Sequence, residues 1–270
     1  MPEFDPSLEN ALQIAQVDSG LFTKTFPDGW QQGRGAFGGI VLGSIARAMD
    51  ACEGDAGRIL SSFTGEIFAP VLPIETAIKV EPLKIGSGVS TYRATLSQKG
   101  EPLAVATGVF GKHRIEMGGW SDLPPPPMAP VAADLPSLPI APPFGPDFAR
   151  AFDFRSAGPL PFAGGKEQVA YGWVCAKSPA AKMGGAELIA MADTFWPSSF
   201  ATASAPRPMA TIAFTFQHFP PATQLDPREP LFYRAKTVAG LSGYLSEIRE
   251  LWSPKGELVA INPQTFVCIK

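Results

Sequence analysis

The residue with the clearest chemical potential is Asp193, a carboxylate in an apolar part of the chain. Residues 186–192 are apolar apart from Glu187, and Phe195 and Trp196 follow Asp193 closely. An ionised carboxylate in such surroundings is costly to bury unless it is hydrogen-bonded or paired. Asp193 therefore either has polar partners, and can act as a general base, or faces solvent near the end of its helix.

Two polar residues could be those partners in the folded chain. Thr211 stands at the start of an expected strand and offers a hydroxyl, and Gln264 stands in the last expected strand and offers a carbonyl oxygen and an amide donor. Taken singly, each has an ordinary explanation, because threonine favours strands and Gln264 could be an edge residue. Their interest lies in the combination with Asp193.

A further candidate site is the start of the first expected helix, at Phe37, Gly38 and Gly39. The first N–H groups of a helix have no partner within it, so they can stabilise negative charge that develops on a substrate carbonyl. Glycine at this point lets a substrate approach the backbone. The alternative is structural: the glycines allow close helix packing, and Phe37 fills the core instead of lining an acyl pocket.

Several other kinds of site are excluded. Residues 33–38 fit the Gly-x-Gly-x-x-Gly pattern of dinucleotide sites, but no apolar strand precedes them and no alternation of strands and helices follows. The chain has no Gly-x-Ser-x-Gly motif, and its histidines, His113 and His218, lie at expected strand ends, which argues against a Ser-His-Asp hydrolase. Two isolated histidines do not indicate a metal site.

Charge, cysteine content and hydropathy narrow the class of protein. The net charge of −3 without a run of Lys or Arg argues against nucleic acid or an anionic membrane as a partner. The three cysteines, Cys52, Cys175 and Cys268, are far apart and indicate neither disulfides nor a zinc site. No export signal and no membrane span is recognisable. We therefore expect a soluble, cytoplasmic protein.

A proline-rich segment divides the chain into two parts with the same elements. Ten of the 29 prolines lie between Pro124 and Pro146, where missing N–H groups disfavour helices and central strands. Before this expected linker we predict a helix at about 38–53 and strands at about 59–69, 74–83, 88–97 and 102–111. After it we predict strands near 148–156 and 168–177, a helix at 184–196, and strands near 209–218, 230–238, 244–252 and 257–267.

The two parts also match residue by residue at a spacing of 156 positions. The matches are Lys99-Gly100-Glu101 with Lys255-Gly256-Glu257, Ser90 with Ser246, Arg93 with Arg249, and Phe110 with Phe266. This pattern indicates an internal duplication. A run of strands after a single helix favours an antiparallel sheet with the helix packed on one face, and two copies would join as a pseudo-dimer.

Four segments, in their order and spacing, resemble the double-hotdog acyl-CoA thioesterases of the acyl-CoA thioesterase II-like family. They are residues 33–39, Met191-Ala192-Asp193, Ala210-Thr211-Ile212 and residues 259–264. The resemblance covers about residues 20–270 and implies an α+β fold of two tandem hotdogs, each a long central helix wrapped by an antiparallel sheet. It places an N-terminal hotdog at 1–114, a linker at 115–147 and a C-terminal hotdog with the catalytic residues at 148–270.

The resemblance also implies an activity. The family has Asp, Thr and Gln at the positions of Asp193, Thr211 and Gln264, and it uses them to hold and activate a water that attacks a thioester carbonyl. This implies hydrolysis of acyl-CoA to free acid and coenzyme A in lipid metabolism, without metal or organic cofactor. Phe37, Gly38 and Gly39 would then bind substrate, and residues 112–114 could meet the coenzyme A phosphates.

Two alternatives stay open. A hydratase acting on enoyl-CoA would need an Asp and His pair at a helix, and neither expected helix contains a histidine. A non-catalytic acyl-CoA or lipid-binding protein would keep the pocket without turnover. Acyl chain length and the formation of a homodimer of such chains are not readable from the sequence.

Overall fold

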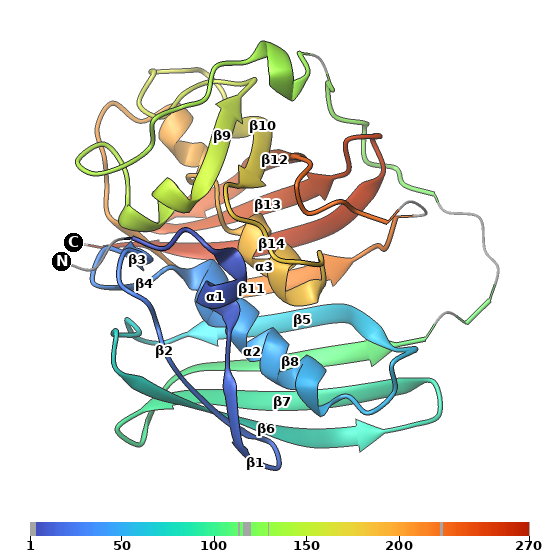
Figure 1. Ribbon diagram of the computed structural model, residues 1–270. Coiled ribbons are helices and arrows are strands. Elements are labelled where there is room, and N and C mark those ends of the chain that lie inside the picture. Colours follow the sequence, from blue (N-terminus) through green and yellow to red (C-terminus); the bar gives the residue numbers. More distant parts are fainter. Residues whose placement is uncertain (1–3, 113, 116–119, 129, 222–223, 270) are drawn as a thin grey trace.

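The protein is built on one large antiparallel sheet. The structure, a computed structural model, describes residues 4–112, 114–115, 120–128, 130–221 and 224–269. Within these residues twelve strands pair in the order β1-β2-β6-β7-β8-β5-β11-β14-β13-β12-β10-β9 (Figure 1). Their bounds are β1 (Ala15–Asp18), β2 (Leu21–Thr25), β5 (Ile59–Ile67), β6 (Glu75–Ile85), β7 (Val89–Gln98), β8 (Glu101–Gly111), β9 (Phe152–Ser156), β10 (Val169–Ala176), β11 (Met209–His218), β12 (Leu231–Leu241), β13 (Tyr244–Trp252) and β14 (Leu258–Cys268); β3 (Gln31–Gln32) and β4 (Gly35–Ala36) pair separately.

Two helices cover one face of this sheet. α2 (Gly38–Cys52) lies over the N-terminal strands and α3 (Gly185–Ala192) over the C-terminal strands, with the short α1 (Leu8–Leu12) beside them (Figure 1). Ten of the fifteen residues of α2 are buried, because the sheet, α1 and α3 surround most of the helix, and this explains why its sequence is apolar on most sides. No helix in the described part of the chain is long and apolar enough to cross a membrane.

Small residues bring α2 and α3 into close contact. A Cβ atom at Gly39 would lie 2.9 Å from the carbonyl oxygen of Ala190, and one at Gly43 would lie 2.8 Å from that of Ala186. The two glycines are one turn apart, as are the two alanines, so both helices present a narrow surface to each other. The contact fixes the start of α2 against the end of α3.

The two halves of the sheet meet at β5 and β11. Thr64 lies opposite Thr215 at the centre of this pairing, with Ser62–Gln217 on one side and Glu66–Ala213 on the other. Outward from the junction the order is β8, β7, β6 on one side and β14, β13, β12 on the other. The antiparallel sheet with helices on one face, expected from the sequence, is therefore confirmed.

The pairing within each half is the same, including a bulge at the same place. The corresponding pairs are Leu60–Phe110 and Phe63–Gly108 in the first half, and Thr211–Phe266 and Phe214–Gln264 in the second. Thr211 thus occupies the position of Leu60, and Gln264 that of Gly108. The C-terminal half therefore has polar side chains at two positions where the N-terminal half has none.

Two residue matches expected from the sequence, Ser90 with Ser246 and Arg93 with Arg249, are wrong. Arg93 is exposed on β7, whereas Arg249 is buried on β13. Seven residues lie between the paired Leu96 and Ala104, whereas eight lie between the paired Leu251 and Ala260, and this extra residue moves β13 by one position. A shift of one residue turns a side chain to the other face of the sheet. The counterpart of Arg249 is therefore Ala94.

Some element boundaries also differ from expectation. The second helix ends at Ala192, four residues early, and the strand expected from 148 begins only at Phe152, after the 3₁₀ helix η2 (Asp147–Ala151). Pro146 precedes η2, and its fixed φ suits the entry to a helical turn. The sequence pattern also does not predict β1, a short exposed strand at the sheet edge without apolar alternation.

The described part of the proline-rich segment lies across the C-terminal half. Leu123, Met128 and the short helix η1 (Ala132–Asp134) pack against a cluster of Trp173, Phe232 and Trp252. The Trp173 indole N–H donates to the carbonyl of Pro130 at 3.0 Å. These contacts anchor the segment to the sheet.

The helix contact can be tested by adding one methyl group. We expect Gly43→Ala to destabilise the protein by about 1–3 kcal/mol, because the new Cβ would overlap the Ala186 carbonyl and the Leu12 side chain. Gly54→Ala is the matched control, since a Cβ at Gly54 meets nothing within 4 Å. Denaturant unfolding measures both, and equal stability of the two variants would contradict the close contact.

Candidate active site

Asp193 lies at the end of α3, where it is the C-cap residue and not an interior helical residue as expected. The chain leaves the helix here, and the Thr194 hydroxyl donates to the carbonyl of Met191 at 2.7 Å. This bond satisfies one of the carbonyl groups that the helix end leaves open. The side chain of Asp193 remains buried, with 7% of its surface exposed, so the solvent-facing alternative does not hold.

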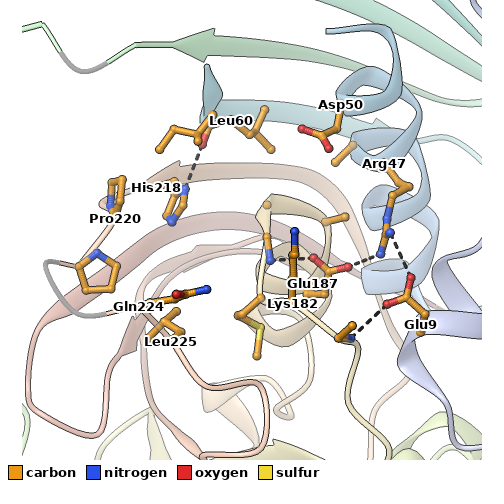
Figure 2. A pocket seen from close by; sticks show the side chains of 18 residues that line it. Glu9, Arg47, Asp50, Leu60, Lys182, Glu187, His218, Pro220, Gln224 and Leu225 are labelled. Carbon is orange, nitrogen blue, oxygen red and sulfur yellow. Dashed lines mark hydrogen bonds and ion pairs between the residues drawn. The ribbon is translucent and has the colours of Figure 1, made fainter. Parts of the chain in front are cut away.

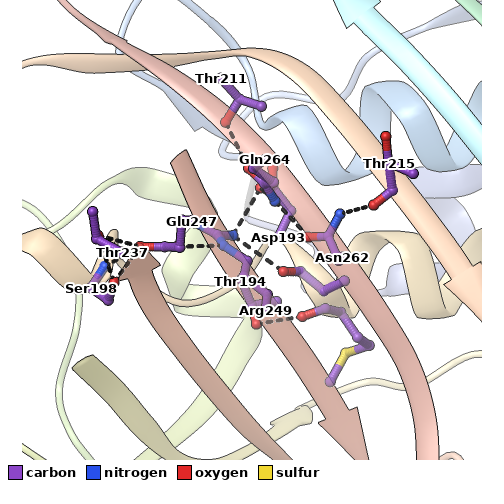
Figure 3. Close-up of polar contacts among 12 residues, drawn as sticks. Asp193, Thr194, Ser198, Thr211, Thr215, Thr237, Glu247, Arg249, Asn262 and Gln264 are labelled. Atoms are coloured by element: carbon purple, nitrogen blue, oxygen red, sulfur yellow. Dashed lines mark hydrogen bonds and ion pairs between the residues drawn. The ribbon is translucent and has the colours of Figure 1, made fainter. Parts of the chain in front are cut away.

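Donors from both halves of the chain surround the Asp193 carboxylate. Arg249 Nη1 lies 3.1 Å and Gln264 Nε2 lies 3.0 Å from its Oδ1 (Figure 3). The backbone N–H of Gly39 donates to the same carboxylate, and a Cβ at Gly38 would come within 2.8 Å of Oδ2. The start of α2, which carries partial positive charge, thus faces Asp193. Glycine at position 38 is what allows this approach.

Thr211, Gln264 and Asp193 form one chain of hydrogen bonds. The Thr211 hydroxyl donates to Gln264 Oε1 at 3.0 Å, and this leaves Gln264 Nε2 to donate to Asp193. Gln264 Nε2 also donates to Asn262 Oδ1 at 2.7 Å, and Asn262 Nδ2 donates to the carbonyl of Thr215. Because both the oxygen and the nitrogen of the Gln264 amide group have partners, the orientation of this amide group is fixed. The structure brings together the three residues singled out in the sequence.

Arg249 and Glu247 belong to the same site but were not singled out in the sequence. Both are almost fully buried on β13, and Arg249 Nε donates to Glu247 Oε1 at 2.7 Å. Glu247 Oε2 in turn accepts from the backbone N–H and the hydroxyl of Ser198, at 2.6 and 2.5 Å (Figure 3). The sequence does contain a signal for these two residues, because successive side chains of a strand point to opposite faces of the sheet. Counting back in steps of two from the apolar Leu251 places Arg249 and Glu247 on the inner face.

Burial and pairing set the ionisation of this cluster. Burial raises the pKa of the Asp193 carboxyl above its ordinary value of 3.8, and Arg249, the Gln264 amide and the Gly39 N–H oppose that rise. Burial acts to lower the pKa of Arg249, but the neighbouring Tyr233, Glu247 and Asp193 outweigh burial and raise it. Arg249 therefore remains a cation between two carboxyl groups. A carboxyl group with a raised pKa is a stronger base once ionised.

The remaining predicted residues have different surroundings. Phe37 is fully buried and stacks on Phe148 with ring centroids 3.8 Å apart, so it packs in the core beside the start of α2. His113 lies outside the described residues. His218 lies at the opposite end of β11 from Thr211. In the described part of the chain no three His, Cys, Asp or Glu side chains are grouped to hold a metal ion.

Two buried polar groups near Asp193 have no hydrogen-bond partner among the described residues. They are the hydroxyl of Tyr233 and the indole N–H of Trp196. Tyr233 stacks on Phe195, with ring centroids 4.4 Å apart, and interacts electrostatically with Arg249. Buried donors of this kind are usually satisfied by water or a ligand.

The charge arrangement predicts opposite stability effects for the two members of the ion pair. Because burial raises the pKa of Asp193, its ionised form costs stability above that pKa, and this cost is absent below pH 3.8. We expect Asp193→Asn to leave the melting temperature at pH 7 unchanged or higher. Arg249→Met leaves two buried carboxylates without their cation and should destabilise by about 3–5 kcal/mol. Thermal unfolding of both variants checks this, and equal losses would contradict the assigned charges.

Comparisons with known proteins agree with this geometry. A conserved protein of unknown function with a hot dog fold from Alicyclobacillus acidocaldarius is 23% identical, with a TM-score of 0.86 and 97% of each chain covered. A putative thioesterase II from Thermobifida fusca is 19% identical, with a TM-score of 0.80 and 97% of each chain covered. An acyl-CoA thioesterase II from Mycobacterium marinum is 18% identical, with a TM-score of 0.76, covering 97% of this chain and 98% of the other. At these identities the likeness establishes the hot dog fold.

The family is established by sequence models of its two domains. No curated protein matches the sequence. Residues 26–111 match the acyl-CoA thioesterase N-terminal domain, and residues 122–268 match the acyl-CoA thioesterase C-terminal domain. The C-terminal match alone spans more than half of the chain and contains Asp193, Thr211 and Gln264. The chain therefore belongs to the acyl-CoA thioesterase family.

Proposed function

We propose that the protein hydrolyses acyl-CoA thioesters to a free acid and coenzyme A, with Asp193 as the general base. The observation that carries this proposal is the hydrogen-bond chain from Thr211 through Gln264 to a buried carboxylate at the start of α2. General base catalysis needs a carboxylate held in place and aimed at a water, and this arrangement holds it from several sides.

The proposed reaction uses the Asp193 carboxylate as the base and the first turn of α2 to stabilise the oxyanion. Asp193 Oδ1 is occupied by Arg249 and Gln264, so Oδ2 is the oxygen that takes a proton from water. The water oxygen then bonds to the thioester carbonyl carbon, and the carbonyl oxygen becomes an oxyanion. The N–H of Gly38 in the first turn of α2 stabilises this charge. When the intermediate collapses, the carbon–sulfur bond breaks and the proton passes to the departing thiolate.

The proposed roles of the other residues follow from where they lie relative to Asp193 and the start of α2. Thr211 and Gln264 orient the water and the carboxylate, and Arg249 with Glu247 holds the carboxylate at the end of α3. Phe37 does not contact substrate in this proposal, because it is fully buried, and it supports the start of α2 from the core. Lipid metabolism and a cytoplasmic location stay predictions from the sequence.

We also propose that the fold is a double hotdog, with an N-terminal hotdog at 1–114, a linker at 115–147 and a C-terminal catalytic hotdog at 148–270. The repeated strand order on both sides of the β5–β11 junction and one helix over each half support this division. The site supports it as well, because the Gly39 donor and the Asp193 acceptor come from different hotdogs. One catalytic site then requires both.

Release of free thiol from acyl-CoA tests the activity. Asp193→Asn should lower turnover by about 10²- to 10⁴-fold with little change in substrate affinity, because it removes the base and keeps the shape. Asp134→Asn, an exposed carboxylate on η1, is the matched control and should leave turnover unchanged. A wild-type protein that binds acyl-CoA without releasing thiol would identify the non-catalytic binding protein instead. Full turnover in a folded Asp193→Asn variant would remove Asp193 from the mechanism.

The domain proposal has its own test. A fragment of residues 1–115 should not form a cooperative, soluble monomer, because separation exposes the β5 edge and the buried face of α2. Analytical ultracentrifugation and thermal unfolding of the fragment measure this. A folded monomer would show that the halves are independent.

A further inference from the structure

A cavity of about 480 Å³ lies at the far end of the α2–α3 pair from Asp193. Its walls come from the start of α3, the second half of α2, the start of β5 and the end of β11, and they include Gly184, Arg47, Leu60 and His218 (Figure 2). Asp193, Thr211 and Gln264 do not line it. Its volume is in the range of small-molecule sites, about 300–1,000 Å³.

The internal repeat relates this cavity to the proposed catalytic site. That site is built from the start of α2, the end of α3 and the start of β11, at Thr211. The cavity is built from the same three features with the halves exchanged: the start of α3, the second half of α2 and the start of β5, at Leu60. A protein with two equivalent halves has two such places.

The two places share one feature and differ in another. Each helix start holds a carboxylate paired with an arginine: Asp193 with Arg249 at α2, and Glu187 with Arg47 at α3. The groups that would orient a water are absent from the cavity, because Leu60 stands in the position of Thr211 and Gly108 in that of Gln264. The cavity therefore has the place for a thioester without the groups proposed to hydrolyse it.

The lining indicates the chemistry of a ligand. Apolar walls come from Ala46, Ile59, Leu60, Met183, Ala186 and Leu225. The Arg47 guanidinium is already paired with Glu187 and Glu9, and burial lowers the pKa of His218, which stays neutral at pH 7 and donates from Nδ1 to the carbonyl of Leu60. An anionic group would meet Glu187 at the helix start. The cavity suits an elongated, uncharged group with apolar and amide parts.

We propose that this cavity is a second, non-hydrolytic binding site for the acyl-pantetheine arm of acyl-CoA. The arm is uncharged, apolar at the acyl end and carries amides along its length. Lys182 lines the cavity and is exposed to solvent, so its positive charge is available to the phosphates of coenzyme A. The choice of ligand rests on the proposed function.

The main alternative is that the cavity receives the acyl tail of the substrate bound at Asp193. The eight residues of α3 separate the two places by about 12 Å along the helix. In that case one ligand would fill both places. Stoichiometry therefore distinguishes the two arrangements.

Isothermal titration with a non-hydrolysable thioether analogue, S-decyl-coenzyme A, provides the test. The wild-type protein should bind two molecules per chain, and Ala181→Trp, which fills the cavity rim, should bind one with kcat/KM unchanged. Gln224→Trp, on another wall of the same cavity, is a second variant with the same expectation if the first does not fold. Ala239→Trp, on the exposed end of β12, is the matched control and should bind two.

Three results are decisive. One molecule per wild-type chain overturns the inference. Two molecules bound by Ala181→Trp also overturn the inference, because the second site would then lie elsewhere. A fall in kcat/KM with decanoyl-CoA in that variant overturns it too, because it assigns the cavity to the acyl tail of the substrate. Free thiol release is measured in parallel: two bound analogues without thiol release retain the second site and refute the proposed hydrolysis.

Discussion

The structure depends on the buried carboxylate of Asp193, which must be stabilised by groups distant in sequence. The start of α2 supplies the Gly39 N–H, β13 supplies Arg249, and β14 supplies Gln264. The Gly39 N–H can reach Asp193 only because α2 and α3 pack closely across the two halves, whereas Arg249 and Gln264 come from the same half as Asp193. The requirement to stabilise this charge thus links helix packing, sheet topology and proposed chemistry.

The sheet meets this requirement in one half only. Gln264, Asn262, Arg249 and Glu247 face inward from β13 and β14, and at the equivalent positions the N-terminal half has Gly108, Ala106, Ala94 and Tyr92. A buried polar cluster is stable when every member has partners, and Ser198 and Thr237 complete this one by donating to Glu247. The N-terminal half has no such polar cluster at the equivalent positions. The free-energy cost of burying polar groups at these positions is therefore confined to the C-terminal half of the duplicated fold.

Much of this arrangement could be predicted from the sequence. Apolar helices, the turns at Gly100 and Gly256 and the proline-rich segment predicted the antiparallel sheet, and Asp193 in apolar surroundings marked the site. Arg249 and Glu247 stand at two-residue steps from the apolar Leu251, but this signal did not single them out, because charged residues in a strand usually face solvent. Their orientation depends on a single extra residue in the last hairpin, which moves β13 by one position. The end of α3 at Asp193 likewise depends on tertiary contacts at its C-terminus.

The most direct test of the account is to compare the titration of Asp193 with the pH dependence of catalysis. The ¹³C resonance of the Asp193 side-chain carboxyl should titrate with a pKa above its ordinary value of 3.8, since burial raises that pKa. The account predicts that kcat/KM for acyl-CoA falls as pH decreases through the same pKa, at pH values where circular dichroism shows a folded protein. A kcat/KM that stays constant while Asp193 becomes protonated would contradict its role as the base.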